Sequence, residues 1–134
     1  MSKLSCVLLV DDDPTTNFIN RKLLERLGVA DQVRVALDGQ QALDVLHAQC
    51  AQQPAGQPVL VFLDVNMPVM NGIQFLEAYQ QLPPARQCAV VVVMLTTSVN
   101  PQDVQRVHEL PVTDFLSKPL TQQQVERVLH AHFP

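Results

Sequence analysis

The stretch CVLLVDDDP, residues 6–14, decides the fold, because an apolar run ends there abruptly in three acids and a proline. The run Cys6–Val10 contains no charged residue, which is typical of a parallel strand that is buried on both faces. Pro14 suits the first position of a helix, and either Asp13 or Thr15 could cap that helix. The stretch therefore predicts a strand that ends in an acidic turn and leads directly into a helix.

Four further short runs along the chain repeat this pattern of a predicted strand followed by a predicted helix. Val59–Leu63 and Ala89–Leu95 are continuously apolar, whereas Gln32–Ala36 and Thr113–Ser117 are shorter or more polar, as edge strands tend to be. Segments with helical patterns and helix-end signals follow the runs. They extend from Pro14 to Gly28, from Asp38 onward, from Gly72 to Gln81, from Asn100 to Pro111 and from Thr121 onward.

The spacing of apolar residues also predicts which helix faces are buried. The first helix is expected to bury Thr16, Ile19, Leu23, Leu24 and Leu27, the second Ala42, Leu43 and Leu46, and the last Val125, Val128 and Leu129. Thr121 and Gln124 have the spacing of a capping box. The polar segment Gln49–Pro58 is expected to be a loop, and no chemistry is assigned to it.

Five strands alternating with five helices predict an α/β protein with an open parallel sheet and right-handed crossovers. The chain has 134 residues, which is too short for an eight-stranded barrel of about 250 residues. We expect a single domain with a flavodoxin-like three-layer sandwich, in which the five-stranded parallel sheet has the order 2-1-3-4-5. The ligand site of such a sheet lies at the carboxyl ends of its strands.

Composition narrows the functional classes. Apolar residues make up 47% of the chain and the net charge is -4, which predicts a folded core and argues against a nucleic-acid binder. No apolar run has the length of about 18 residues that a membrane span needs. The N-terminus lacks a secretory signal, and the three cysteines are odd in number and widely spaced. We therefore expect a cytoplasmic protein with reduced thiols.

Polar side chains follow four of the predicted strands. They are Asp11-Asp12-Asp13 after the first, Asp64 after the third, Thr96-Thr97-Ser98 after the fourth and Lys118-Pro119 after the fifth. Clustered carboxylates repel one another unless a cation lies among them, and oxygen ligands without histidine or cysteine favour Mg²⁺. A metal-bound carboxylate beside a hydroxyl and an amine is equipped to attack phosphorus. These residues predict a Mg²⁺-assisted phosphoryl transfer onto an aspartate.

The same motifs resemble those of the receiver domains of two-component response regulators. The resemblance covers about residues 4–132 and is carried by VDDDP at 10–14, DVNMPVMNG at 64–72, LTTS at 95–98 and KP at 118–119. It implies that Asp64 is the phospho-acceptor. It also implies that Mg²⁺ is held by Asp11, Asp12, Asp64 and the backbone carbonyl of Asn66.

The resemblance assigns roles to four more positions. Thr96 matches the hydroxyl that turns inward to the phosphoryl group, and Lys118 matches the lysine that contacts a phosphoryl oxygen. Pro119 matches a proline that follows a cis peptide bond. Phe115 matches the aromatic switch residue, although it lacks the hydroxyl of the tyrosine that is common there. For Asp13, capping or exposure is expected instead of metal binding.

The resemblance implies a stand-alone response regulator without an output domain. It would accept phosphate from a sensor histidine kinase or a histidine phosphotransfer protein, and it would catalyse only its own phosphorylation and dephosphorylation. It would signal by contact with a downstream protein, without binding nucleic acid or membrane. The fourth helix, fifth strand and fifth helix, about Pro101 to His132, are the expected output face, which could also pair with a second copy.

Three other functions are compatible with this fold class but fit the residues less well. A flavodoxin-like FMN binder is disfavoured because the three acids at 11–13 would repel the flavin phosphate. An aspartate-nucleophile phosphatase needs a second acid two residues after the nucleophile, where this chain has Asn66. A receiver-like scaffold that is never phosphorylated would generally lose site residues, and this chain keeps them. The four histidines are scattered on predicted helices and predict no metal site.

Overall fold

The computed structural model describes residues 4–52, 59–64, 77–78, 90–96, 114–117 and 120–132. In chain order these hold β1 (Leu4–Val10), α1 (Pro14–Leu27), β2 (Ala30–Ala36), α2 (Gly39–Gln52), β3 (Val59–Asp64), β4 (Val90–Thr96), β5 (Asp114–Ser117) and α5 (Gln122–His132). The third predicted helix is described only at Glu77 and Ala78, which are helical. The fourth predicted helix lies outside the described residues.

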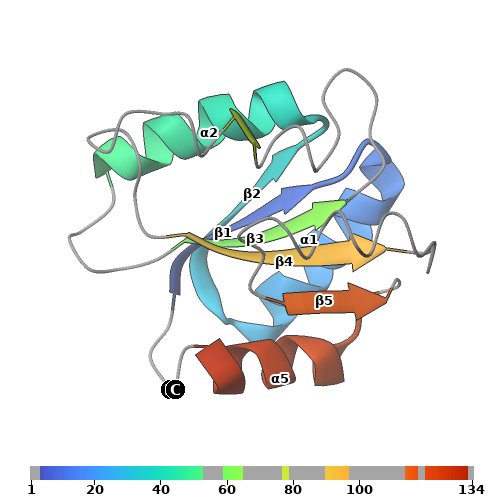
Figure 1. The fold of residues 1–134 in the computed structure, drawn as a ribbon. Helices are drawn as coiled ribbons and strands as arrows, with labels where there is room; N and C mark the ends of the chain where they lie inside the picture. The colour runs from blue at the N-terminus through green and yellow to red at the C-terminus, as the bar shows by residue number, and fades with distance from the viewer. Residues whose placement is uncertain are drawn as a thin grey trace.

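The strands form one parallel sheet in the order β2-β1-β3-β4-β5, which confirms the predicted topology (Figure 1). Val10 pairs with Ala36 of β2 and with Leu63 of β3. The ends of β1, β2 and β3 are therefore level at the carboxyl edge of the sheet, with β3 one residue longer than the pair Val10–Leu63. This register brings the residues after β1 beside Asp64 at the end of β3.

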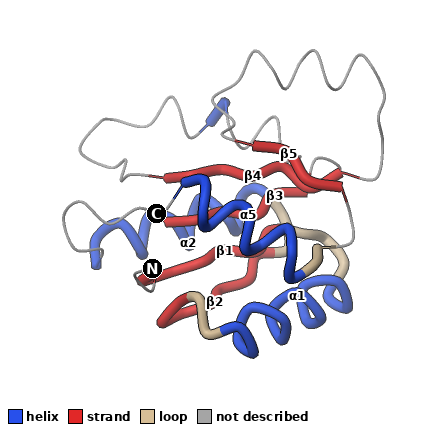
Figure 2. Tube along the Cα trace, turned by 90° about the horizontal axis from the view of Figure 1, so that it is seen from below, coloured by secondary structure: helices blue, strands red, loops and turns tan. Residues whose placement is uncertain are grey.

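Helices cover both faces of the sheet, so the described part of the chain has three layers. α2 lies on one face and α1 and α5 lie on the other (Figures 1 and 2). Alternate residues of the strands point to opposite faces of the sheet and pack into two separate hydrophobic cores. The core under α2 includes Leu8, Val61 and Met94, and the core under α1 and α5 includes Leu9, Phe62 and Val93. Every residue of β3 is buried, as expected for the central strand.

The buried faces of α2 and α5 are the predicted ones. Ala42 and Leu46 are buried in the core under α2, and Leu43 packs against it. Val125, Val128 and Leu129 are buried on α5.

Side chains and one glycine define the helix ends. Asp13 is the cap of α1, because its carboxylate accepts a hydrogen bond from the Thr15 N–H at 2.9 Å. Gly28 ends α1 with φ of 64°, in the left-handed region that favours glycine. At α5 the Gln124 N–H donates to the Thr121 hydroxyl at 3.2 Å, and Gln124 Oε1 accepts from the Thr121 N–H at 3.1 Å. The predicted capping box is thus confirmed.

The buried face of α1 differs from the prediction. Ile19 was expected to face inward but is 59% exposed, and Thr16 is only half-buried. The residues that are buried are Asn17, Asn20 and Leu24, while Leu23 and Leu27 pack partly against the core. The buried amide of Asn17 is hydrogen-bonded to backbone carbonyls, so a polar side chain takes a place that apolar spacing assigned to Ile19.

The predicted loop Gln49–Pro58 begins as helix, because α2 continues to Gln52. Gln49 is buried, and its Oε1 accepts a hydrogen bond from Arg34 Nη1 of β2 at 3.3 Å. Glutamine is a good helix former, and this contact satisfies its buried amide oxygen, so polarity alone does not end the helix here. Residues 53–58 lie outside the described part.

Among the described helices, none has both the length and the apolar character that a membrane crossing requires.

Candidate functional site

The acidic turn after β1 is held by backbone hydrogen bonds. The Asp11 N–H donates to the Ala36 carbonyl of β2 at 3.1 Å, which extends the ladder one residue past β1. The Asp13 N–H donates back to Asp11 Oδ1 at 3.0 Å. Asp13 then caps α1, so its carboxylate serves the helix, in agreement with the role expected for it. The turn is thus tied to β2 on one side and to α1 on the other.

Three carboxylates meet at the carboxyl edge of the sheet. One oxygen each from Asp11, Asp12 and Asp64 lies within 4.8 Å of the other two. Asp11 and Asp64 are buried, with 4% and 6% of their surfaces exposed, whereas Asp12 is exposed. The cluster therefore has a buried floor and one side open to solvent.

This donor set fits Mg²⁺. The cluster consists of carboxylate oxygens from three aspartates, without a histidine or cysteine among its members. Oxygen ligands of this kind suit a hard divalent cation, and the open side leaves room for water or phosphate oxygens. Three like charges at this spacing repel one another, and a cation among them relieves that repulsion.

The structure describes the other predicted site residues only in part. Thr96 is the last residue of β4 and pairs with Ser117, and Phe115 lies in β5 opposite Met94. The side chains of Thr96 and Phe115 lie outside the described residues, as do Asn66, Lys118 and Pro119 altogether. Their assigned roles stay predictions.

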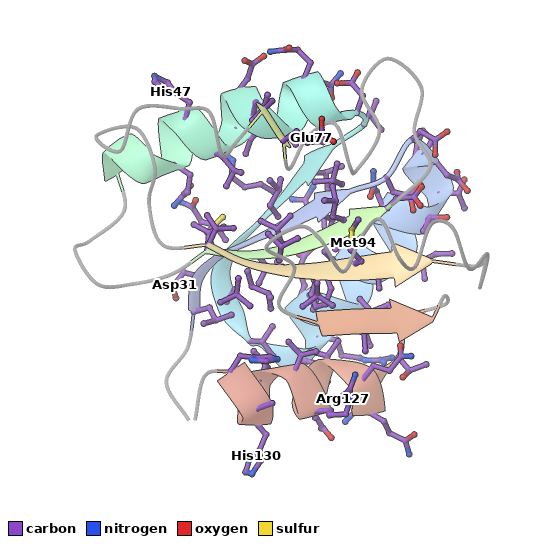
Figure 3. All side chains as sticks on the ribbon, viewed as in Figure 1. Asp31, His47, Glu77, Met94, Arg127 and His130 are labelled. Atoms are coloured by element: carbon purple, nitrogen blue, oxygen red, sulfur yellow. The ribbon has the colours of Figure 1, made fainter. Side chains whose placement is uncertain are left out.

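The described histidines lie away from the cluster. His47 lies on α2 and His130 on α5, on opposite faces of the sheet (Figure 3). His132 follows on α5, and His108 lies outside the described residues.

Cys6 of β1 is a core residue and not part of the site. Its side chain is buried, and burial raises the pKa of the thiol, an effect that the nearby positive charge of Arg34 partly opposes. The thiol therefore stays protonated at neutral pH.

A second surface feature, an apolar patch on α1, was missed by the sequence reasoning. Phe18 and Ile19 are 61% and 59% exposed, although both are large and apolar. They border an open groove of about 530 Å³ that is lined by Phe18, Ile19, Lys22, Leu23, Arg26 and Leu120. The Lys22 ammonium lies 5.5 Å from the centre of the Phe18 ring. α1 carries more large apolar residues than its inward face can bury, and this excess is the sequence signal for the patch.

The fold and the site together define a class of protein. A parallel sheet in this order, with a cluster of carboxylates at the carboxyl ends of β1 and β3, defines a flavodoxin-like α/β protein with an acidic crevice. The family model that describes the response regulator receiver domain matches residues 7–130 of the sequence, and the chain belongs to this family.

Curated relatives extend over nearly the whole chain. It is similar to two-component response regulator 24 of Arabidopsis thaliana, with 34% identity over 96% of this chain and 84% of that protein. It is also similar to a probable chemotaxis protein CheY of Rhizobium etli, with 33% identity over 95% of this chain and 91% of that protein.

Solved structures show the same fold. A response regulator receiver protein from Dyadobacter fermentans superposes with a TM-score of 0.80 and 30% identity, over 97% of this chain and 98% of that one. A two-component response regulator from Cytophaga hutchinsonii gives a TM-score of 0.81 and 25% identity, over 97% of each chain.

Proposed function

We propose that this receiver domain accepts a phosphoryl group on Asp64 from a phosphohistidine of a sensor histidine kinase or a histidine phosphotransfer protein. Asp11, Asp12 and the backbone carbonyl of Asn66 would hold Mg²⁺ beside that carboxylate. The observation that carries the proposal is the cluster of three carboxylate oxygens within 4.8 Å, with Asp64 buried at the end of the central strand. The chain would catalyse only its own phosphorylation and dephosphorylation.

The chemistry is an in-line displacement at phosphorus. A carboxylate oxygen of Asp64 forms the new P–O bond while the P–N bond to the donor imidazole breaks. The electron pair of that bond returns to the imidazole nitrogen, and the ring, protonated on its other nitrogen, leaves as neutral imidazole. Mg²⁺ held by the carboxylate cluster would supply positive charge against the oxygens of the transferred group. Lys118 and Thr96 would contact the same oxygens from β5 and β4.

The patch on α1 supports a protein as the donor. α1 begins directly after the acidic turn, so the exposed Phe18 and Ile19 lie in the first turns of the helix that Asp13 caps. Lys22 and Arg26 line the same groove, which adds positive charge beside the apolar surface. A donor helix with an apolar stripe and flanking acids would complement this face.

Signalling to a downstream protein would use the face formed by the fourth helix, β5 and α5. Phosphorylation adds nearly two negative charges at Asp64, and Thr96 and Phe115 would report that change by moving inward. Amide chemical shifts of the protein with and without beryllofluoride test this switch. Shift changes confined to the loops around Asp11, Asp64 and Lys118 would contradict it.

The decisive experiment is labelling with acetyl phosphate and Mg²⁺, followed by intact-protein mass spectrometry. The parent is expected to gain one phosphoryl group, and Asp64→Asn none. Asp44→Asn is the matched control, because Asp44 is an exposed acid on α2. Omitting Mg²⁺ with a chelator tests the metal separately. An unlabelled parent would favour the receiver-like scaffold that is never phosphorylated, and a labelled Asp64→Asn variant would place the acceptor elsewhere.

A further inference from the structure

We propose that Asn17 is a positioning residue for the metal site, which it serves by fixing the backbone of the acidic turn. The inference rests on the proposed function, because it assumes that Asp11, Asp12 and Asp64 bind Mg²⁺. It concerns a residue of α1 that does not belong to the carboxylate cluster.

Asn17 reaches the ends of two strands from the first turns of α1. Its side chain is buried, with 2% of the residue exposed. The amide Nδ2 donates to the Asp11 carbonyl at 2.8 Å, and it also lies 3.4 Å from the Ala36 carbonyl at the end of β2. The first of these is a short hydrogen bond made to the backbone of a proposed metal ligand.

The chemistry of the two partners determines the orientation of this amide. Both partners are carbonyl oxygens, which only accept hydrogen bonds. The NH₂ group must therefore face them, and Oδ1 must point the other way. Among the described residues, Asn17 Oδ1 is a buried oxygen without a hydrogen-bond partner.

An unpaired buried oxygen disfavours asparagine on stability grounds. Leaving such a group unsatisfied is costly, whereas an apolar side chain of similar size would avoid this cost. The hydrogen bonds of Nδ2 to the Asp11 and Ala36 carbonyls are the compensating interactions of the asparagine. A contribution to the placement of the acidic turn accounts for an asparagine at this buried position.

The contacts of Asp11 show how Asn17 would act. The backbone N–H of Asp11 donates a hydrogen bond to the Ala36 carbonyl, and its backbone carbonyl accepts one from Asn17 Nδ2. Its Oδ1 accepts a third hydrogen bond from the Asp13 N–H. These three hydrogen bonds leave the carboxylate little freedom relative to Asp64. Without Asn17 the peptide after Asp11 can rotate, and the carboxylates of Asp11 and Asp12 lose their placement.

The test compares two leucine substitutions on the same helix. Asn17→Leu preserves size and removes the donor. Asn20→Leu is the matched control, because Asn20 is also buried on α1 and lies nearly one turn further from the acidic turn. Mg²⁺ is titrated into each protein, and amide chemical shifts give its dissociation constant. We expect Mg²⁺ to bind about tenfold more weakly to Asn17→Leu, as is typical for loss of an outer-shell partner, and within twofold of the parent to Asn20→Leu.

The melting temperatures of both variants show how much each substitution destabilises the fold, so that a loss of Mg²⁺ affinity can be told apart from a loss of stability. An unchanged Mg²⁺ affinity in Asn17→Leu would overturn the proposal, whatever its melting temperature. An equal loss of affinity in Asn20→Leu would also overturn it, because the effect would then be a general loosening of α1. A parent that binds no Mg²⁺ would instead refute the proposed function.

A measurement on the parent protein covers the case in which Asn17→Leu does not fold. The side-chain NH₂ resonances of Asn17 and Asn20 are followed during the same Mg²⁺ titration. We expect the Asn17 resonances to shift with the dissociation constant of the metal and the Asn20 resonances to stay in place. Asn17 resonances that do not respond to Mg²⁺ would contradict the inference.

Discussion

Replacing Asp11 with asparagine should stabilise the metal-free protein and abolish most of its stabilisation by Mg²⁺. The substitution preserves the shape of the side chain and keeps Oδ1 as the acceptor for the Asp13 N–H. It removes one of the three charges whose oxygens lie within 4.8 Å of one another. Two of the three repulsive pairs in the cluster are thereby lost.

The spacing sets the size of the effect. Two unit charges 4.8 Å apart repel by about 1 kcal/mol at the dielectric constant of water and by about 3 kcal/mol at an effective value of 20. Because Asp12 is exposed, its pair with Asp11 lies near the lower value, whereas the pair of Asp11 with the buried Asp64 lies nearer the upper one. The two lost pairs together give at most about 4 kcal/mol, which corresponds to a rise of the melting temperature by up to about 15 °C for a domain of this size.

Calorimetric melts in a chelator and in excess Mg²⁺ test this reasoning. At a Mg²⁺ concentration tenfold above its dissociation constant the parent gains about 1.4 kcal/mol, and the variant should gain little. Asp38→Asn is the control, because Asp38 also accepts a backbone hydrogen bond, from Gln41 at 2.8 Å, but does not belong to the cluster. An Asp11→Asn variant that melts at or below the parent temperature in chelator would refute the argument from repulsion.

Three further predictions concern other parts of the chain. Gly28→Ala should lower the free energy of unfolding by about 1–2 kcal/mol, because φ at this position is 64°. The added Cβ meets no atom within 4 Å, so the loss measured by urea melts reports backbone strain alone. An unchanged stability would contradict this argument. The raised pKa of Cys6 means that the unfolded chain loses its thiol proton first, so stability should fall as the pH rises above about 8.5. A Cys6→Ala variant should show a smaller fall in urea melts across that range, and an equal fall would exclude Cys6 as its cause. Finally, Phe18→Ala/Ile19→Ala should slow phosphorylation by the protein donor at least tenfold and leave labelling by acetyl phosphate unchanged; equal rates with both donors would show that the patch is not a docking surface.

The strands and the edge that holds the site could be predicted because their signals are local, and the order of the strands was then the common one for five alternating strands and helices. Continuous apolar runs such as Val59–Leu63 indicate strands covered on both faces, and the polar residues after them mark the edge where a site forms. Two of the carboxylates that meet there, Asp11 and Asp12, adjoin one run, and Asp64 follows another. Their convergence follows from parallel pairing and needs no knowledge of side-chain packing.

The orientation of α1 could not be predicted in the same way. Apolar spacing places Ile19 inward, but the helix is rotated so that Asn17 and Asn20 are buried. Hydrogen bonds from Asn17 to the ends of β1 and β2 appear only once the strands are adjacent in space. Gln49 shows the same limit, since its partner Arg34 comes from a strand 15 residues earlier.

The rotation of α1 has an evolutionary consequence. Its inward residues, Asn17, Asn20 and Leu24, face the sheet, and its outward residues, Phe18 and Ile19, face solvent. Under the proposed docking, a substitution at an outward position would change which protein is recognised without moving the acidic turn. Duplicated copies of such a gene would then diverge toward separate donors through a few surface positions, while the contacts between Asn17 and the acidic turn stay the same.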